Sequence, residues 1–144
     1  MIEQERKFKL KFLPEKLESV EIKQGYLVSD GDRVLRVRII DDKTALMTFK
    51  ISKSDTIRNE YEYKILIEDG LELYKNSLYR ITKRRYYTTF NGNHVDIDVY
   101  KNGKSVIEIE FENELTDLPP YCGEEVTGVK EWSNIWMAMH NNEN

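Results

Sequence analysis

The chain has 144 residues, of which 40% are hydrophobic, 11% aromatic and 33% charged, and its net charge is −4. This length suits one domain spanning residues 1–144, and the nine Tyr, five Phe and two Trp argue against intrinsic disorder. No apolar run approaches the ~20 residues that span a bilayer. The single cysteine, Cys122, excludes an intrachain disulfide, and charges from Glu3 onward leave no room for a signal peptide. We therefore expect a cytoplasmic protein that makes no membrane contact.

Alternation of apolar and polar residues recurs through most of the chain and predicts strands. The expected strands are residues 2–10, 21–28, 33–41, 44–51, 58–67, 79–89, 94–101 and 104–113. The pairs Asn91-Gly92 and Asn102-Gly103 are strong hairpin signals, which makes the last three strands a meander. Eight mostly antiparallel strands predict a mainly β protein built as a closed barrel.

Three short helices are expected beside these strands. Pro14 opens a helical piece over residues 14–19, and residues 68–78 form a second helix despite an internal glycine. Near the C-terminus, the spacing of Trp132, Ile135, Trp136 and Met139 describes one apolar face of a third helix.

The polar faces of the strands carry charges of two kinds. The first and last strands carry acids at alternate positions, whereas the middle strands carry Arg and Lys at alternate positions. For any single strand, a solvated outer face is the simplest interpretation. The collective pattern favours a charged interior instead, because closure of the sheet brings the first and last strands together. Glu3 and Glu5 then face Glu108 and Glu110 across one seam.

Four carboxylates in such proximity repel one another unless cations bind them, and their oxygens suit Mg²⁺ or Mn²⁺. Mg²⁺ sites usually combine few carboxylates with substrate phosphates. Bases on the remaining walls therefore predict a ligand that contains a chain of phosphates. Nucleic acid is not expected, because the net charge is negative and Lys83-Arg84-Arg85 is the only basic run.

The same residues resemble a known family. The segment Glu3-Gln4-Glu5-Arg6-Lys7 is similar to the N-terminal Glu-x-Glu-x-Lys signature of the CYTH domain, or triphosphate tunnel metalloenzymes. The resemblance continues in order through nearly the whole chain, over residues 24–27, 36–38, 46–50, 58–62, 83–86, 98–100, 107–111, 125–128 and 132–134.

What the resemblance implies is an eight-stranded antiparallel barrel whose hydrophilic tunnel binds triphosphate-containing molecules with Mg²⁺ or Mn²⁺. By the family pattern, the metal ligands are Glu3, Glu5, Glu108 and Glu110. The phosphate-contacting residues are Lys7, Arg36, Arg38, Lys50, Arg58, Lys83 and Arg85. Asp98 falls near a second-metal or water-activating position, so it and Lys7 are the candidates for positioning the attacking water. Asp96 is a secondary candidate.

The resulting hypothesis is a metal-dependent hydrolase that acts by water attack on a terminal phosphorus, with inorganic tripolyphosphate as the favoured substrate. An enzyme of nucleoside triphosphates or thiamine triphosphate, including a class IV adenylate cyclase, is the first alternative. A non-catalytic module that binds nucleotide or polyphosphate is the second. The protein is expected to be a monomer or a homodimer.

Overall fold

A computed structural model describes residues 2–141 of the chain. Strands dominate this part of the chain, and their bounds are β1 (Ile2–Leu10), β2 (Glu18–Asp30), β3 (Arg33–Ile40), β4 (Thr44–Ser52), β5 (Ile57–Ile65), β6 (Tyr79–Phe90), β7 (Asn93–Tyr100), β8 (Ser105–Glu110) and β9 (Cys122–Glu125). The helices are α1 (Ile67–Lys75), the 3₁₀ turn η1 (Lys130–Trp132) and α2 (Asn134–Met139). None of the helices that the structure describes has the length and apolar character needed to cross a membrane.

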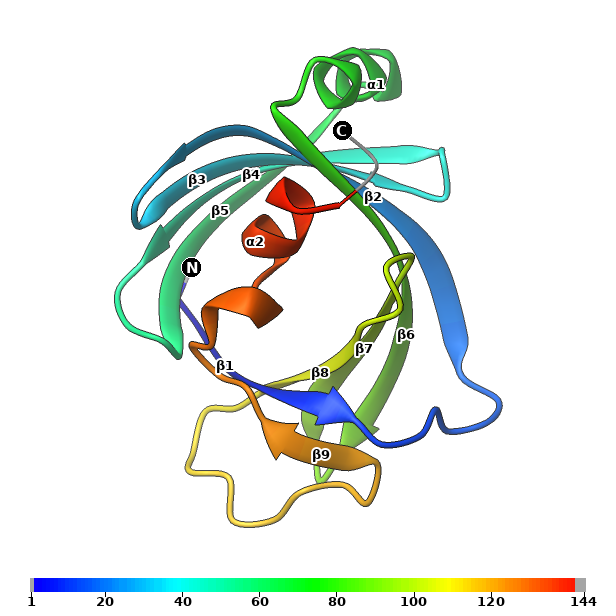
Figure 1. The fold of residues 1–144 in the computed structure, drawn as a ribbon, viewed down its shortest axis with the longest axis vertical. Helices are drawn as coiled ribbons and strands as arrows, with labels where there is room; N and C mark the ends of the chain where they lie inside the picture. Colours follow the sequence, from blue (N-terminus) through cyan, green and yellow to red (C-terminus); the bar gives the residue numbers. More distant parts are fainter. Residues whose placement is uncertain (1, 142–144) are drawn as a thin grey trace.

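Eight of the strands form the closed antiparallel barrel that the alternation predicted (Figure 1). Their order is β5-β4-β3-β2-β6-β7-β8-β1, and the barrel closes because β1 also pairs with β5, where Glu3 lies opposite Arg58. The predicted proximity of the first and last strands of the barrel is confirmed, since residues 5–9 of β1 pair with β8. The short strand β9 adds to β1 outside the ring.

The tight turns follow the sequence signals. Asn91 and Gly92 both adopt positive φ, 51° and 79°, between β6 and β7, as a two-residue hairpin turn of this kind requires. Gly103, with φ 92°, turns the chain between β7 and β8. The predicted three-stranded meander is thereby confirmed.

Two local predictions were wrong. Residues 14–17 form no helix, and Glu18 already belongs to β2; Lys16 adopts a φ of 63°, which is incompatible with a right-handed helical turn. The strand β9 was not predicted, and the expected strand over 104–113 ends at Glu110. Four-residue strands lack the length over which alternation becomes visible.

The apolar side chains on the outer faces of β1, β3, β7 and β8 are covered by other segments, whereas those of Tyr61 and Tyr63 on β5 are exposed. The outer side of β1, β7 and β8 packs beneath the segment that leads into β9, which contributes Tyr121 and Cys122 to the cluster. The helix α1 covers the outer side of β3 and β4. A Cβ on Gly70 would lie 2.3 Å from the Cβ of Ala45, so the internal glycine of α1 permits this close approach.

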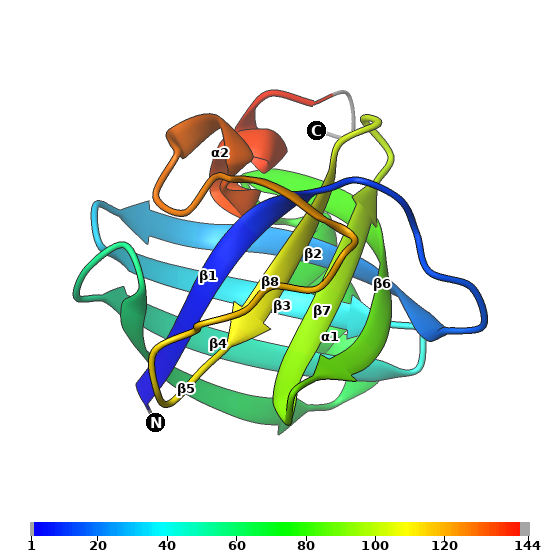
Figure 2. The ribbon, with the colours of Figure 1, turned by 90° about the horizontal axis from the view of Figure 1, so that it is seen from below.

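The helix α2 lies at one end of the barrel (Figures 1 and 2). Its residues Met137 and Ala138 are buried against Tyr26, Tyr100 and Val106. Ser133 caps the helix by accepting a hydrogen bond from the backbone N–H of Trp136 at 3.2 Å. The helix α2 therefore closes the apolar end of the barrel. The polar side chains on the inward faces of the strands remain to form a site.

Candidate functional site

The barrel encloses a cavity of about 100 Å³, called here the central cavity. Among the residues that the structure describes, every lining side chain is charged except one amide. The lining residues are Glu3, Glu5, Arg36, Arg38, Lys50, Glu60, Glu62, Arg85, Asp96, Glu108, Glu110 and Asn134. Eight of the twelve residues predicted to form the site lie in this lining, and Lys7, Arg58, Lys83 and Asp98 do not.

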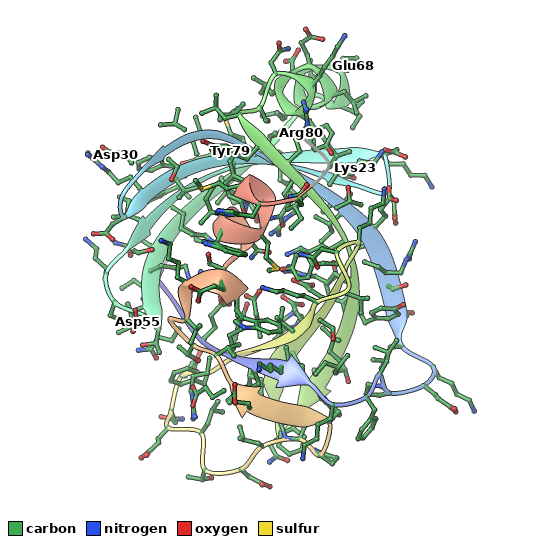
Figure 3. All side chains as sticks on the ribbon, in the orientation of Figure 1. Lys23, Asp30, Asp55, Glu68, Tyr79 and Arg80 are labelled. Atoms are coloured by element: carbon green, nitrogen blue, oxygen red, sulfur yellow. The ribbon has the colours of Figure 1, made fainter. Side chains whose placement is uncertain are left out.

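Two further cavities adjoin the central one. The front cavity, of about 800 Å³, shares Glu3 and Glu110 with it and extends along the 111–117 segment. The rear cavity, of about 350 Å³, shares Glu5 and lies between the β4–β5 loop and η1; Figure 3 labels Asp55 on this loop. Glu3 and Glu110 therefore border both the central and the front cavity, and Glu5 borders both the central and the rear cavity.

The acidic wall of the central cavity comes from β1 and β8. Glu5 lies opposite Glu110, and Lys7 lies opposite Glu108. Burial, together with the nearby Glu108 carboxylate, raises the pKa of Glu5 to about 8. Burial and the neighbouring Glu60 raise the pKa of Glu3 to about 7. These carboxyl groups therefore hold protons that an added cation could displace.

The basic wall comes from β3 and β4. Arg36 is buried, and its Nε has no hydrogen-bond partner within the described part of the chain. Arg38 donates two hydrogen bonds, at 3.0 and 2.7 Å, to the side-chain oxygen of the buried Gln24. Lys50 forms an ion pair of 2.8 Å with Glu60. A buried guanidinium N–H without an acceptor is costly, so Arg36 is suited to an anionic ligand.

Residues of β6 and β7 form a buried ionic cluster. Asp98 is fully buried, and its carboxylate accepts hydrogen bonds from Arg85 Nε and Nη2, both at 2.8 Å. Lys83 Nζ lies 2.7 Å from the same carboxylate. Although burial opposes ionisation, Arg85 and Lys83 lower the pKa of Asp98 to about 2. The carboxylate of Asp98 is thus fully engaged by bases and does not line the cavity.

Lys7 and Arg58 lie toward the rear cavity. Lys7 Nζ donates a hydrogen bond of 3.1 Å to the backbone oxygen of Trp132 and lies 4.0 Å from Glu108 Oε1. Arg58 Nη2 forms an ion pair with Glu5. Both bases therefore hold carboxylates of the acidic wall, and both line the rear cavity.

The carboxylates around the central cavity can be compared with the ligands that a divalent cation needs. Among residues 2–141 no three His, Cys, Asp or Glu side chains already converge as a metal cluster, because Arg58 and Lys50 draw carboxylates toward themselves. The buried Glu108 Oε1, however, has no hydrogen-bond partner in this part of the protein. Carboxylate oxygens are the donors that hard cations prefer, and a cation that binds them displaces the protons. The residues present therefore fit a hard divalent cation.

Three lining residues, Glu60, Glu62 and Asn134, were not among the predicted site residues, and Asp96 was only a secondary candidate. Glu60 and Glu62 alternate with Tyr61 on β5, and Asp96 precedes Asp98 by two positions, so each carried the signal of an inward face. Asp96 receives contacts from His94 at 2.7 Å and Arg85 at 3.2 Å. The lining residue Asn134 lies on a helix, where strand alternation gave no signal.

The raised pKa values predict how stability depends on pH. Glu3 and Glu5 keep protons in the folded protein that the unfolded chain releases near pH 4.5. Without a metal, the free energy of unfolding should therefore fall between pH 5 and pH 7, by up to about 1.4 kcal/mol per pH unit for each proton held. Above pH 7 the trend is offset, because burial lowers the pKa of Lys83 to about 7 and that of Lys50 to about 8.

Urea unfolding at several pH values measures this dependence. Mg²⁺ at pH 7 should restore stability, since cation binding displaces the same protons. A free energy of unfolding that rises between pH 5 and pH 7 in metal-free buffer would contradict the assignment of the protons to Glu3 and Glu5.

Fold and site together define a class of protein: a closed antiparallel barrel whose interior opposes a wall of acids to a wall of bases around a small cavity. A CYTH domain is matched over residues 1–134, and the chain belongs to this family.

Individual relatives extend over most of the chain. The inorganic triphosphatase of Acetivibrio thermocellus is 33% identical over 119 residues, which cover 78% of this chain and 76% of that protein. The inorganic triphosphatase of Nitrosomonas europaea is 32% identical over 150 residues, covering 96% of this chain and 98% of that protein. The crystal structure of the inorganic triphosphatase NE1496 superposes with a TM-score of 0.70 at 30% identity, covering 96% and 98% of the two chains.

Proposed function

We propose that this protein is a divalent-cation-dependent inorganic triphosphatase, which hydrolyses tripolyphosphate to pyrophosphate and orthophosphate. The observation that carries the proposal is the central cavity, whose described lining contains charged side chains and one amide but no aromatic or aliphatic side chain. Such a lining recognises phosphate and cation and offers nothing to a base or a sugar ring. The names of the two relatives from Acetivibrio thermocellus and Nitrosomonas europaea support the same substrate.

The basic wall holds the polyphosphate chain in this proposal. Arg36, Arg38 and Lys50 place three cationic groups on one side of the cavity, and Arg85 adds a fourth from β6. They bind the charged oxygens and offset the charge that develops as the bond to the leaving pyrophosphate breaks. No side chain forms a covalent intermediate; a water molecule attacks the terminal phosphorus.

The acidic wall holds the cation. Glu3, Glu5, Glu108 and Glu110 are the proposed ligands, and a bound Mg²⁺ or Mn²⁺ would neutralise and orient the phosphates. Arg58 pairs with Glu5 of this wall, and Glu60 pairs with Lys50 of the basic wall. Substrate binding would therefore draw Lys50 away from Glu60 as its charge is shared with a phosphate.

The predicted role of Asp98 changes with its placement. Its carboxylate is taken up by Arg85 and Lys83, so we assign to it the positioning of these bases instead of contact with water. Lys7 reaches the central cavity only toward Glu108, and its proposed role is to hold that carboxylate. That Lys7 also orients the attacking water remains a prediction.

Substrate comparison tests the proposal. Purified protein is incubated with tripolyphosphate, ATP or thiamine triphosphate at matched free Mg²⁺, and orthophosphate, pyrophosphate and cyclic AMP are measured. We expect the highest kcat/KM for tripolyphosphate and no cyclic AMP, because the cavity lining has no group that contacts an adenosine. A clear preference for ATP, or binding of tripolyphosphate without turnover, would reject the proposal.

Two arginines make a matched pair for testing the inward wall. Arg36 lines the central cavity with an unpaired Nε, whereas Arg84 is exposed and donates to Ser19 Oγ at 2.9 Å. Arg36→Ala should lower kcat/KM for tripolyphosphate roughly 10- to 150-fold, the cost of losing one charge-assisted hydrogen bond. Arg84→Ala should leave it within about twofold. Equal losses in steady-state assays of the two variants would show that the assignment of inward and outward faces is incorrect.

A further inference from the structure

The side-chain amide of Asn134 is the one uncharged group in the described lining of the central cavity. Asn134 is the first residue of α2, the helix that closes this end of the barrel. Its Oδ1 accepts a hydrogen bond of 3.2 Å from Lys83 Nζ and another from Tyr100 Oη. Lys83 and Tyr100 are both buried, and neither lines the cavity.

These two contacts fix the orientation of the amide. Lys83 Nζ, held by the Asp98 carboxylate at 2.7 Å, donates to Asn134, and Tyr100 donates to the same atom, so the Asn134 atom that faces them is the oxygen. The Nδ2 group is then on the other side of the planar amide. Lys83 and Tyr100 both donate to the oxygen, and neither of them lines the central cavity. The edge of the Asn134 amide that borders the cavity is therefore the NH₂ edge. No hydrogen bond from this NH₂ group is formed within residues 2–141.

A free amide donor at the closed end of a cavity lined by bases is matched by an anionic oxygen. Amide N–H groups donate well to phosphate oxygens and, unlike Arg or Lys, they add no charge to the site. The remaining lining donors come from the strand wall, so Asn134 is the only described donor that approaches from the helix. The end of a ligand that reaches α2 would contact the Asn134 amide.

We propose that Asn134 is a substrate-binding residue whose Nδ2 donates a hydrogen bond to the innermost phosphate group of the bound triphosphate. This inference rests on the proposed function. Asn134 would thereby mark where the polyphosphate chain ends against α2. The same residue would couple the bound chain to the buried Lys83–Asp98 cluster through its oxygen.

Two substitutions separate this role from a structural one. Asn134→Asp keeps an oxygen for Lys83 and Tyr100 but replaces the donor with a negatively charged acceptor. Asn134→Ala removes the oxygen and the donor together and adds no charge. If the amide only anchors α2, Asn134→Ala should lower the thermal midpoint and leave the Kd within about twofold of the wild-type value. If its Nδ2 binds phosphate, the Kd of Asn134→Ala rises, and that of Asn134→Asp rises further because a repelling charge replaces the donor.

Isothermal titration with a non-hydrolysable imido analogue of tripolyphosphate in the presence of Mg²⁺ measures affinity without turnover. We expect a Kd about tenfold higher for Asn134→Ala than for the wild type and at least tenfold higher again for Asn134→Asp. The thermal midpoint should be lower for the Ala variant than for the Asp variant, opposite to the order of affinity. Asn102→Asp, which adds the same charge on the exposed turn after β7, should bind like the wild type.

The outcomes are distinct. Affinity of the Asp variant equal to or better than that of the Ala variant overturns the inference, whatever the wild-type activity. Wild-type protein that neither binds this analogue with Mg²⁺ nor hydrolyses tripolyphosphate rejects the proposed function instead. If the Asp variant does not fold, a Kd for Asn134→Ala within twofold of the wild-type value overturns the inference by itself.

Discussion

Removal of divalent cations is expected to bring the hydrolysis of tripolyphosphate to background, and Mg²⁺ or Mn²⁺ should restore it. The physical reason is the acidic wall: Glu5 and Glu110 are direct neighbours across β1 and β8, and Glu108 has an unpaired buried oxygen. Without a cation, these groups repel a polyanion at close range. Assays in EDTA followed by titration with each metal measure the effect.

Glu108→Gln is the variant that tests the same wall. It preserves the shape of the side chain and removes one negative charge, so kcat should fall roughly 10²- to 10³-fold, as for other losses of a preorganised electrostatic group. The apparent Mg²⁺ affinity should fall with it. Glu68→Gln on α1, which Figure 3 shows far from the barrel interior, serves as the control. Full activity in a metal-free preparation would contradict the assignment of the acidic wall.

The largest loss of stability is expected from Asp98→Ala. This change leaves Lys83 and Arg85 buried without their counter-ion, and breaking a buried pair in this way costs about 3–5 kcal/mol. Denaturant unfolding monitored by circular dichroism measures the difference. Asp30→Ala removes the exposed partner of Arg33, whose ion pair of 2.6 Å is solvated, and should change the free energy of unfolding by less than about 1 kcal/mol.

A double variant distinguishes the uncompensated charge from a simple loss of packing. Adding Lys83→Met to Asp98→Ala removes one of the stranded cations, so part of the lost stability should return. If Asp98→Ala is as mild as Asp30→Ala, or if Lys83→Met makes it worse, the buried cluster does not contribute as described.

The closed barrel and the charged character of its inward faces could be predicted from the sequence alone. Strand alternation has a period of two, so a charged residue on one face is separated from an apolar residue on the other without knowledge of the partner strand. Because the acids gather on the first and last strands, closure alone was enough to predict that Glu3 and Glu5 come near Glu108 and Glu110. The register decided that Glu5 lies opposite Glu110, Glu108 opposite Lys7 and Glu3 opposite Arg58. The hairpin turns followed from local backbone preferences of Asn-Gly pairs.

The tertiary structure decided how deep each inward side chain lies. Asp96 and Asp98 share one face of β7 and carry the same alternation signal, yet Asp96 lines the cavity and Asp98 is enclosed by Lys83 and Arg85. Depth along the barrel is set by strand register and tilt, and these depend on pairing with distant segments. For the same reason the sequence did not single out Asn134 as a site residue: its amide joins the site only because α2 packs across the end of the barrel.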